Sequence, residues 1–287
     1  MRDYLKEMRV SHYIKNILVF AALACSGQFF DWKKLFCSMM GFFSFCMVSS
    51  VVYVINDIKD IEKDRQHPTK CKRPIAAGKI TIRSAVILVI GMSVTAFICS
   101  IFTCSAVSGL FLLIYLFLNI SYSIGLKNIP IADISILVSG FLLRVIYGAV
   151  ITDIEISHWL YLAVIASAFY FVLGKRRNEL QKIQTGNTRK VLKFYTESFL
   201  DKNMYMCLAL VHVFYALWCT DEKTAEAYQN HYLLWTVPVV LIIMMRYSLD
   251  VESDSDGDPT EVLIHDKTLA ALVLIYLSVM LCLLYVF

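Results

Sequence analysis

The chain has 287 residues, of which 58% are hydrophobic and only 17% are charged, and its mean hydropathy is +0.63. Soluble globular domains carry about 25% charged residues, so this composition excludes an ordinary soluble enzyme and gives no reason to expect a nucleic-acid partner. The net charge of +4 is small and conceals a very uneven distribution of basic residues along the chain.

Nine apolar segments are close to the length that a helix needs to cross the hydrocarbon core of a bilayer. They cover approximately residues 15–30, 35–56, 84–103, 105–123, 132–151, 157–174, 204–220, 231–248 and 268–287. No stretch between them is long enough for a separate soluble domain. The sequence therefore predicts an all-α membrane protein with about nine transmembrane helices and a single polytopic domain over residues 1–287.

The basic residues predict the orientation of these helices in the membrane. With the N-terminus in the cytoplasm, 23 of the 27 lysines and arginines lie on the cytoplasmic side and three on the outer side. Because lysine and arginine are enriched in cytoplasmic loops, we expect a multi-pass protein of the inner (cell) membrane with a cytoplasmic N-terminus and an outer C-terminus. The long polar loops are then cytoplasmic, and we expect the active face on that side.

The nine cysteines contain no CxxC pair and lie mostly within the apolar segments, where cysteine acts as a small apolar residue. The six histidines show no metal-ligand spacing either. A disulfide framework or a zinc site is therefore not expected.

Three carboxylates follow the second apolar segment, in the stretch NDIKDIEKDRQHPTKCKRPIAAGK at 56–79. On one continuous helix, Asp60 would lie about 60° and Asp64 about 20° from Asp57 around the axis, so all three would share a face. Carboxylates packed this closely repel one another unless a cation offsets them, and oxygen ligands suit Mg²⁺, which commonly joins one or two carboxylates to substrate phosphates.

The residues around these carboxylates extend the argument to a phosphate ligand. Asn56 adds an amide beside them, and a basic run follows at Arg65, Lys70, Lys72, Arg73 and Lys79. Carboxylates, a metal ion and basic groups together predict a diphosphate site. A solvated, charge-balanced loop is the alternative interpretation.

The fifth apolar segment carries two charges, Asp133 at its start and Arg144 eleven residues later. On a helix they share a face, about 16 Å apart along the axis. An arginine at that depth should face the interior of the bundle, next to an anion, and a structural ion pair is the alternative. Similar candidates stand at the ends of the first and fourth segments: Lys15, Asn16, Tyr122 and Lys127.

The sixth apolar segment ends in GKRRNEL, which places three basic residues at one membrane level. Lys175 and Arg176 are candidates for phosphate binding, with Glu179 one turn later. Arg177 is expected only to flank the cytoplasmic helix end. The segment 250–261 holds six acidic residues but fits the calcium-loop pattern in no register, so we expect a flexible acidic connection.

Together these motifs resemble the UbiA-type intramembrane prenyltransferase superfamily. Its NDxxDxxxD motif stands here at 56–64, and its arginine–proline pair stands as Arg73 and Pro74. The second aspartate-rich motif of the superfamily, DxxxD, is replaced by Lys175 and Glu179. With this departure, the stretches 12–22, 56–78, 122–134, 174–180 and 246–251 resemble the branch that transfers phosphoribose to a polyprenyl phosphate.

This resemblance implies nine helices around a central cavity open to the cytoplasmic side. It also implies 5-phosphoribosyl 1-diphosphate as donor, a decaprenyl-type polyprenyl phosphate as acceptor and Mg²⁺ as cofactor. Asp57, Asp60 and Asp64 would hold the metal. The residues expected to bind the substrates are Lys15, Asn16, Asn56, Lys70, Arg73, Tyr122, Lys127, Arg144, Lys175, Arg176 and Glu179.

Two other functions are consistent with these residues. The first is a superfamily enzyme that moves a prenyl group from prenyl diphosphate to an aromatic acceptor. The second is a transporter or lipid-binding membrane protein, although such proteins often show repeated halves and broken helices, and no matching halves are visible in this sequence.

Overall fold

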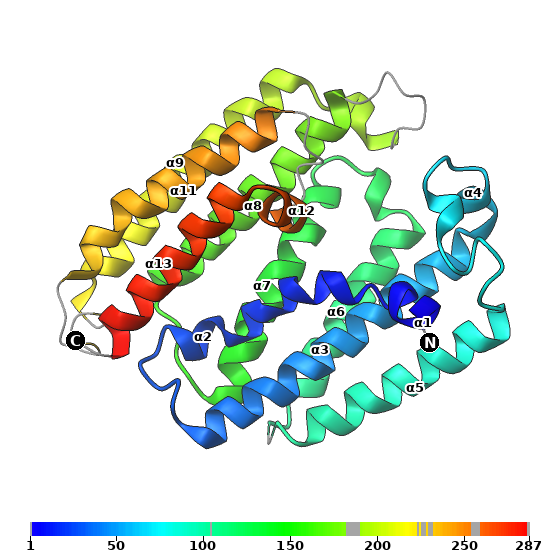
Figure 1. Cartoon of the computed structure of the whole chain (residues 1–287), viewed down its shortest axis with the longest axis horizontal. Coiled ribbons are helices and arrows are strands. Elements are labelled where there is room, and N and C mark those ends of the chain that lie inside the picture. The colour runs from blue at the N-terminus through cyan, green and yellow to red at the C-terminus, as the bar shows by residue number, and fades with distance from the viewer. Residues whose placement is uncertain are drawn as a thin grey trace. The chain divides into compact units, whose positions relative to one another are not determined.

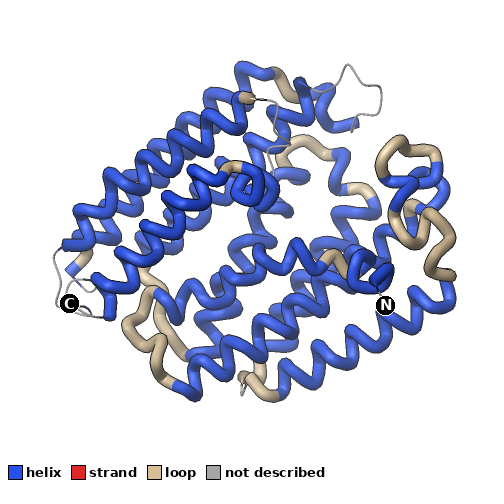
Figure 2. Tube along the Cα trace, in the orientation of Figure 1, coloured by secondary structure: helices blue, strands red, loops and turns tan. Residues whose placement is uncertain are grey.

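The computed structural model describes residues 2–103, 105–181, 190–222, 224, 228, 232–253 and 259–285. All regular elements within these ranges are helices (Figures 1 and 2). The chain divides into two compact units, Met1–Leu23, Gln28–Ile124 and Leu143–Ile154 in the first, and Ala24–Gly27, Gly125–Leu142 and Glu155–Phe287 in the second. Part of the acidic segment, residues 254–258, lies outside the described residues.

The first unit is built on its longest helix. Its elements are α1 (Arg2–Glu7), η1 (Val10–Phe20), α2 (Ala21–Ala24), α3 (Trp32–Lys59), α4 (Ile61–Arg65), η2 (Lys70–Lys72), α5 (Ile82–Ile101), α6 (Ser108–Ile124) and the end of α7 (Ala132–Thr152). The helices η1, α5 and α6 all pack on α3. Asp31 caps α3 by accepting hydrogen bonds from the backbone N–H groups of Lys33 and Lys34.

The helix α3 ends at Lys59, and this differs from the expected continuous helix through all three aspartates. The next helix, α4, begins at Ile61, with Asp60 between the two. Asp57 therefore lies in the last turn of α3, whereas Asp64 belongs to a separate short helix. No glycine or proline stands at the break, which is why the sequence does not predict it.

The contact between η1 and α7 is unusually close. A methyl group added at Gly148 would lie 1.9 Å from the backbone carbonyl oxygen of Val19. Only glycine permits this approach. It holds η1 against α7, where Asn16 of η1 accepts a hydrogen bond from Arg144.

The second unit contains the remaining helices. They are the start of α7, η3 (Leu126–Asn128), α8 (His158–Gln181), η5 (Lys190–Phe194), α9 (Glu197–Thr220), η6 (Tyr232–Thr236), α11 (Val237–Glu252), α12 (Pro259–His265) and α13 (Lys267–Tyr285). The helices α8 and α9 pack along each other and, with α11, enclose the core of this unit around Tyr170, Leu200 and Tyr247.

Seven of the described helices are long and apolar enough to cross a membrane. They are Trp32–Lys59, Ile82–Ile101, Ala132–Thr152, His158–Gln181, Glu197–Thr220, Tyr232–Glu252 and Lys267–Tyr285. Two shorter apolar helices, Val10–Ala24 and Ser108–Ile124, correspond to the first and fourth expected spans. The first of them begins five residues earlier than expected. A total of nine crossings stays a prediction.

Candidate active site

The first charged cluster lies in the first unit and is centred on Asp57, which is only 3% exposed. Arg9 Nη2 donates to both carboxylate oxygens of Asp57, at 2.7 and 2.9 Å. Arg73 Nη1 donates to Asp57 Oδ1 at 2.9 Å and to Asp64 Oδ2 at 2.6 Å. One guanidinium nitrogen thus contacts two buried carboxylates, so a single cationic centre already bridges the first and last aspartates of the motif.

The middle aspartate is in a different environment. The Asp60 side chain is 27% exposed, and its Oδ1 lies 3.6 Å from Lys63 Nζ. Asp60 therefore contacts Lys63 and is partly exposed, whereas the buried Asp57 and Asp64 share Arg73. Asn56, one residue before Asp57, is half-buried at the end of α3.

A fourth carboxylate, Glu7, belongs to this cluster and was not anticipated from the sequence. Its side chain is 1% exposed, and neither carboxylate oxygen accepts a hydrogen bond of ordinary length and angle from the described residues. Burial, followed by the neighbouring charge of Asp57, raises the pKa of Glu7 to about 7. Arg9 was also missed, because nothing in the sequence near residue 9 indicates a partner 48 positions later.

A second polar group in the first unit surrounds Arg144, which is 6% exposed. Arg144 Nε donates to Asn16 Oδ1 at 2.7 Å, and Nη2 donates to the Tyr115 hydroxyl at 3.0 Å. Its guanidinium also lies 5.0 Å from the ring centres of Phe45 and Tyr115. The structure thus brings together two predicted residues, Asn16 and Arg144, that are 128 positions apart.

The second unit holds its own buried ion pair. Arg176 Nε donates to Asp133 Oδ2 at 2.7 Å, and both side chains are fully buried. Arg176 Nη1 donates to Glu179 Oε2 at 2.7 Å. Asp133 therefore pairs with Arg176. These contacts make Arg176 and Glu179 neighbours, whereas the motif spacing related Glu179 to Lys175, one turn before it.

Tyr195 completes this group and was also missed by the sequence. Its hydroxyl donates to Asp133 Oδ1 at 2.5 Å and accepts the backbone N–H of Ile131 at 2.8 Å. Burial and the hydrogen bond to Asp133 raise the pKa of Tyr195 to about 12. A lone tyrosine before an apolar segment gives no signal of this role.

The other predicted residues are distributed over both units and are at least partly accessible. Lys15, Asn56, Arg73 and Tyr122 are half-buried and Lys70 is exposed in the first unit, while Lys127, Lys175 and Glu179 are half-buried in the second. Arg177, expected only to flank a helix end, in fact joins α8 to α9, because its Nε donates to Asp201 Oδ1 at 2.5 Å. Its role is therefore at least partly structural.

Asp57 and Asp64 could bind a divalent cation, but the described residues do not form a complete set of protein ligands for one. Within the described ranges, no three His, Cys, Asp or Glu side chains are gathered as in a preformed metal centre. Asp57 and Asp64 do present oxygens to one shared cationic nitrogen. Mg²⁺ keeps several waters and often takes only one or two protein carboxylates together with substrate phosphates, so this pair fits Mg²⁺ that arrives with a diphosphate.

Comparison with known proteins adds a family and several relatives. Residues 17–263 match the model of the UbiA prenyltransferase family. The decaprenyl-phosphate phosphoribosyltransferase of Mycolicibacterium smegmatis is 34% identical over 96% of this chain and 90% of its own length. The enzyme of the same name from Corynebacterium glutamicum is 34% identical over 94% and 83%, respectively.

The fold also has relatives among solved structures. A UbiA homolog from Archaeoglobus fulgidus, solved bound to DMAPP and Mg²⁺, superposes with a TM-score of 0.73 over 98% of this chain and 99% of that chain. The sequence identity is 17%, so this likeness concerns the fold. The all-helical architecture expected from the sequence is thereby confirmed.

Proposed function

The chain belongs to the UbiA prenyltransferase family, and we propose that it transfers 5-phosphoribose from 5-phosphoribosyl 1-diphosphate to a decaprenyl-type polyprenyl phosphate. The observation that carries this proposal is the match, over nearly the whole chain, to two enzymes named for decaprenyl phosphate and phosphoribosyl transfer. The replacement of the second aspartate-rich motif by Lys175 and Glu179 supports it.

The reaction requires little acid–base chemistry. An oxygen of the acceptor phosphate attacks the anomeric carbon of the donor, and the bond from that carbon to the diphosphate oxygen breaks. The diphosphate leaves with the bonding electron pair. Because the acceptor phosphate is already an anion near neutral pH, catalysis consists of positioning and of stabilising charge.

The buried carboxylates of the first unit supply the metal-binding part of this scheme. Asp57 and Asp64 would hold Mg²⁺, with Asp60 and Asn56 in support, and the bound ion would neutralise the leaving diphosphate. Arg73 lies at the same carboxylates and is placed to contact phosphate oxygens bidentately. Other first-unit groups proposed to hold phosphates are Lys15, Asn16, Lys70, Tyr122 and Arg144.

In the second unit, Lys175 and Lys127 are the half-buried cations that we assign to substrate phosphates. Arg176 is fully buried and bound to Asp133 and Glu179. We therefore assign Arg176 and Glu179 to positioning of this end of α8, next to Lys175, so that they act on the substrate through their neighbour.

The proposal includes the placement of the chain in the inner membrane. We propose nine crossings, counting the two shorter apolar helices Val10–Ala24 and Ser108–Ile124, with the N-terminus in the cytoplasm and the C-terminus outside. The two units would then form one polytopic membrane domain. The distribution of lysine and arginine supports this orientation.

A transfer assay with purified protein tests the proposed function. Labelled phosphoribosyl diphosphate, decaprenyl phosphate and Mg²⁺ are supplied, and label is measured in the lipid fraction with and without a chelator. We expect Mg²⁺-dependent transfer that is abolished in Asp57→Asn. The matched control is Glu62→Gln, which removes an exposed carboxylate five residues away and should keep wild-type turnover.

Two outcomes would contradict the proposal. Transfer from labelled prenyl diphosphate to an aromatic acceptor, with none from phosphoribosyl diphosphate, would identify the alternative enzyme of the same family. No transfer from either donor by folded protein would favour a transporter or lipid-binding protein.

A further inference from the structure

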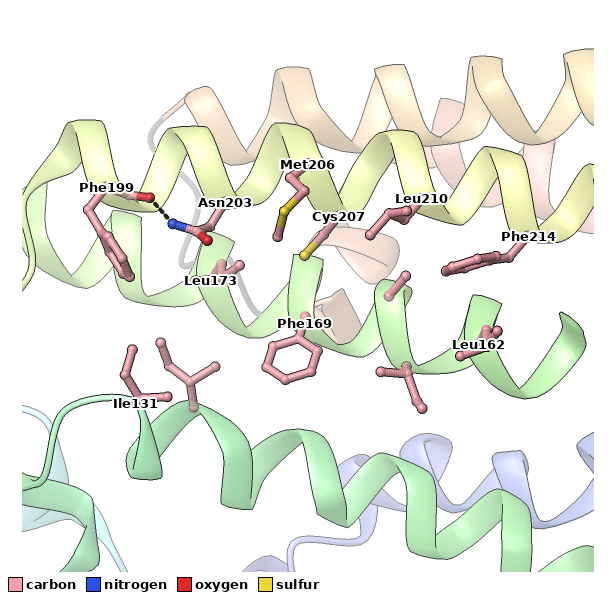
Figure 3. Close-up of a pocket in the computed structure, with 13 residues that line it drawn as sticks. Ile131, Leu162, Phe169, Leu173, Phe199, Asn203, Met206, Cys207, Leu210 and Phe214 are labelled. Atoms are coloured by element: carbon pink, nitrogen blue, oxygen red, sulfur yellow. Dashed lines mark hydrogen bonds between the residues drawn. The ribbon is translucent and has the colours of Figure 1, made fainter. Parts of the chain in front are cut away.

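The pocket drawn in Figure 3 lies in the second unit, between the start of α7 and the pair α8 and α9, and its lining is almost entirely apolar. Asn203 is the exception, and its side chain donates to the backbone carbonyl oxygen of Phe199 on the same helix. None of the described residues that line this pocket is Asp, Glu, Lys, Arg or His. The pocket therefore offers no group that would bind an ion, whereas such groups are gathered at the end of α3 in the first unit.

Glu7, the last residue of α1, is a buried carboxylate in this cluster without a cation of its own. In the described part of the chain, no lysine or arginine pairs with it and neither oxygen accepts a hydrogen bond of ordinary geometry. The neighbouring carboxylate, Asp57, contacts two guanidinium groups, those of Arg9 and Arg73. A buried carboxylate without a partner is costly, so this uneven sharing of cations calls for a reason.

Arg9 holds Asp57 through a single nitrogen atom. Its Nη2 donates to both carboxylate oxygens, at 2.7 and 2.9 Å, whereas Nε and Nη1 make no hydrogen bond to any described residue. The strong pairing of arginine with a carboxylate uses two parallel N–H···O bonds from two nitrogens. The contact between Arg9 and Asp57 is therefore incomplete, and it leaves two nitrogens of Arg9 able to bind a second carboxylate.

Arg9, rather than Arg73, is the cation that a metal ion at Asp57 would displace. Arg73 Nη1 is held by two carboxylates, at 2.9 Å from Asp57 and 2.6 Å from Asp64. Among the described residues, Arg9 donates only to Asp57. A divalent cation repels both guanidinium groups, and the one with a single carboxylate partner leaves at the lower cost. Glu7 lies in the same cluster, two residues before Arg9, and is a carboxylate able to receive it.

The backbone at Arg9 is held in place, so a change of partner needs only the side chain to move. The Met8 carbonyl oxygen accepts the Ser50 hydroxyl at 2.9 Å, which ties this turn to α3. Arg9 itself is left-handed, with φ 52° and ψ 51°, a conformation that a residue other than glycine keeps where its surroundings enforce it. Figure 1 shows α1 beside the end of α3, in agreement with the contacts between these helices.

We propose that Arg9 exchanges carboxylate partners when a divalent cation binds: it neutralises Asp57 in the metal-free protein and moves to Glu7 when the cation takes Asp57. Glu7 is then a positioning residue, which acts on the metal through Arg9. The exchange opens Asp57 to the cation without leaving Arg9 or Glu7 unpaired, and an unpaired buried charge is strongly unfavourable. The inference rests on the metal at Asp57 in the proposed function, but it requires no substrate.

Binding of Mn²⁺ to the purified protein without substrates, measured by electron paramagnetic resonance, tests the exchange. The variant Asp57→Asn gives the background from other sites. Glu7→Gln should weaken binding at Asp57 about tenfold, because Arg9 then has no second partner, and Arg9→Gln should strengthen it about tenfold, both within the usual range of coupling between sites. Glu62→Gln, which removes an exposed carboxylate, is the matched control and should keep the wild-type affinity.

The double variant Glu7→Gln/Arg9→Gln separates the exchange from direct coordination by Glu7. If Glu7 acts only through Arg9, its replacement should change the Kd for Mn²⁺ less than about twofold in the Arg9→Gln background. The same weakening in both backgrounds would make Glu7 a metal ligand and overturn the proposal, as would equal affinities of Glu7→Gln and wild type. Should Arg9→Gln not fold, Arg9→Lys keeps the charge, and Glu7→Gln should weaken binding in that background as in wild type; no change there would refute the exchange.

The metal-binding measurement and the transfer assay fail independently. The expected pattern of Mn²⁺ affinities, found in protein that transfers label from neither donor, would refute the proposed function and leave the exchange of Arg9 standing. Transfer by a wild-type protein that binds no Mn²⁺ above the Asp57→Asn background would refute the exchange and leave the reaction standing.

Discussion

The variant Arg176→Met measures how much the second unit depends on its buried ion pair. Arg176 and Asp133 have no exposed side-chain surface, and the distance from Nε to Oδ2 is 2.7 Å. Methionine keeps much of the length of the arginine side chain but leaves the Asp133 carboxylate without its ionic partner. Removing one member of a buried pair costs about 3–5 kcal/mol.

This loss of free energy predicts a large fall in thermal stability. With a Tm shift of about 2–4 °C per kcal/mol for large domains, the fall is roughly 6–20 °C. The double variant Arg176→Met/Asp133→Leu should recover most of it, since an apolar replacement of the whole pair removes the unpaired charge. The matched control is Arg65→Met, which removes an exposed arginine that pairs with the exposed Glu62 and donates to the Ala76 carbonyl oxygen at 3.3 Å. It should cost about 1–2 kcal/mol, less than the loss expected for Arg176→Met.

Scanning fluorimetry of the detergent-solubilised protein gives the Tm values, and the transfer assay is run below the lowest Tm. A Tm for Arg176→Met equal to that of Arg65→Met would refute the reasoning, as would a double variant no more stable than the single one. Transfer that stays lost in a fully stable double variant would show that the charge of Arg176 serves the reaction in addition to folding.

Three further variants test other contacts. Arg177→Ala should lower stability by about 1.5–3 kcal/mol, the value of a hydrogen bond to a charged group, with little change in turnover, and a large loss of turnover at unchanged Tm would contradict this role. The wild-type protein should lose stability as pH rises from about 4.5 to about 7, because its folded state favours the protonated Glu7 carboxyl and the unfolded state does not. Glu7→Gln has no such group, so in metal-free buffer its free energy of unfolding should rise relative to that of wild type by up to roughly 3 kcal/mol over this range. A difference in stability that does not change with pH would contradict the raised pKa of Glu7. Gly148→Ala should impair folding or transfer because its methyl group meets backbone, whereas Gly91→Ala, with open space around it, should do neither.

The helices could be predicted from the sequence because their apolar content is a local property. The residues of the NDxxDxxxD motif were identified for the same reason. The closeness of Asp57 and Asp64 was also predicted, and Arg73 contacts both. The break of the helix at Asp60 was not predicted, because no glycine or proline marks it and the first proline comes only at Pro68. The pairing of Asp57 with Arg9 was not predicted either, because it depends on tertiary packing that brings the N-terminal segment next to the end of α3.

The run GKRRNEL shows a second limit of sequence reasoning. Lys175, Arg176 and Arg177 are adjacent and similar in chemistry, so the sequence gives no basis for ranking them. Successive residues differ by about 100° around a helix, and this rotation sends Arg176 into the core toward Asp133 while Arg177 turns toward Asp201. Their roles are therefore decided by the rotational position of α8, which depends on the packing of the whole unit.

The buried charges cost more than stability alone would justify. Asp57, Asp133, Arg144 and Arg176 all lie buried in helices apolar enough to span a membrane. Arg144 stands in the middle part of α7, and a charge at the bilayer centre costs about 2.5–3.5 kcal/mol, whereas the other three stand near helix ends. Well-packed apolar residues in place of a buried pair are often as stable or more so. Because a well-packed apolar pair would hold the fold about as well, the chemistry of the site is the better reason for these charges. It follows that folding and transfer should be separable, so that an apolar replacement of a whole pair keeps the fold and loses the reaction.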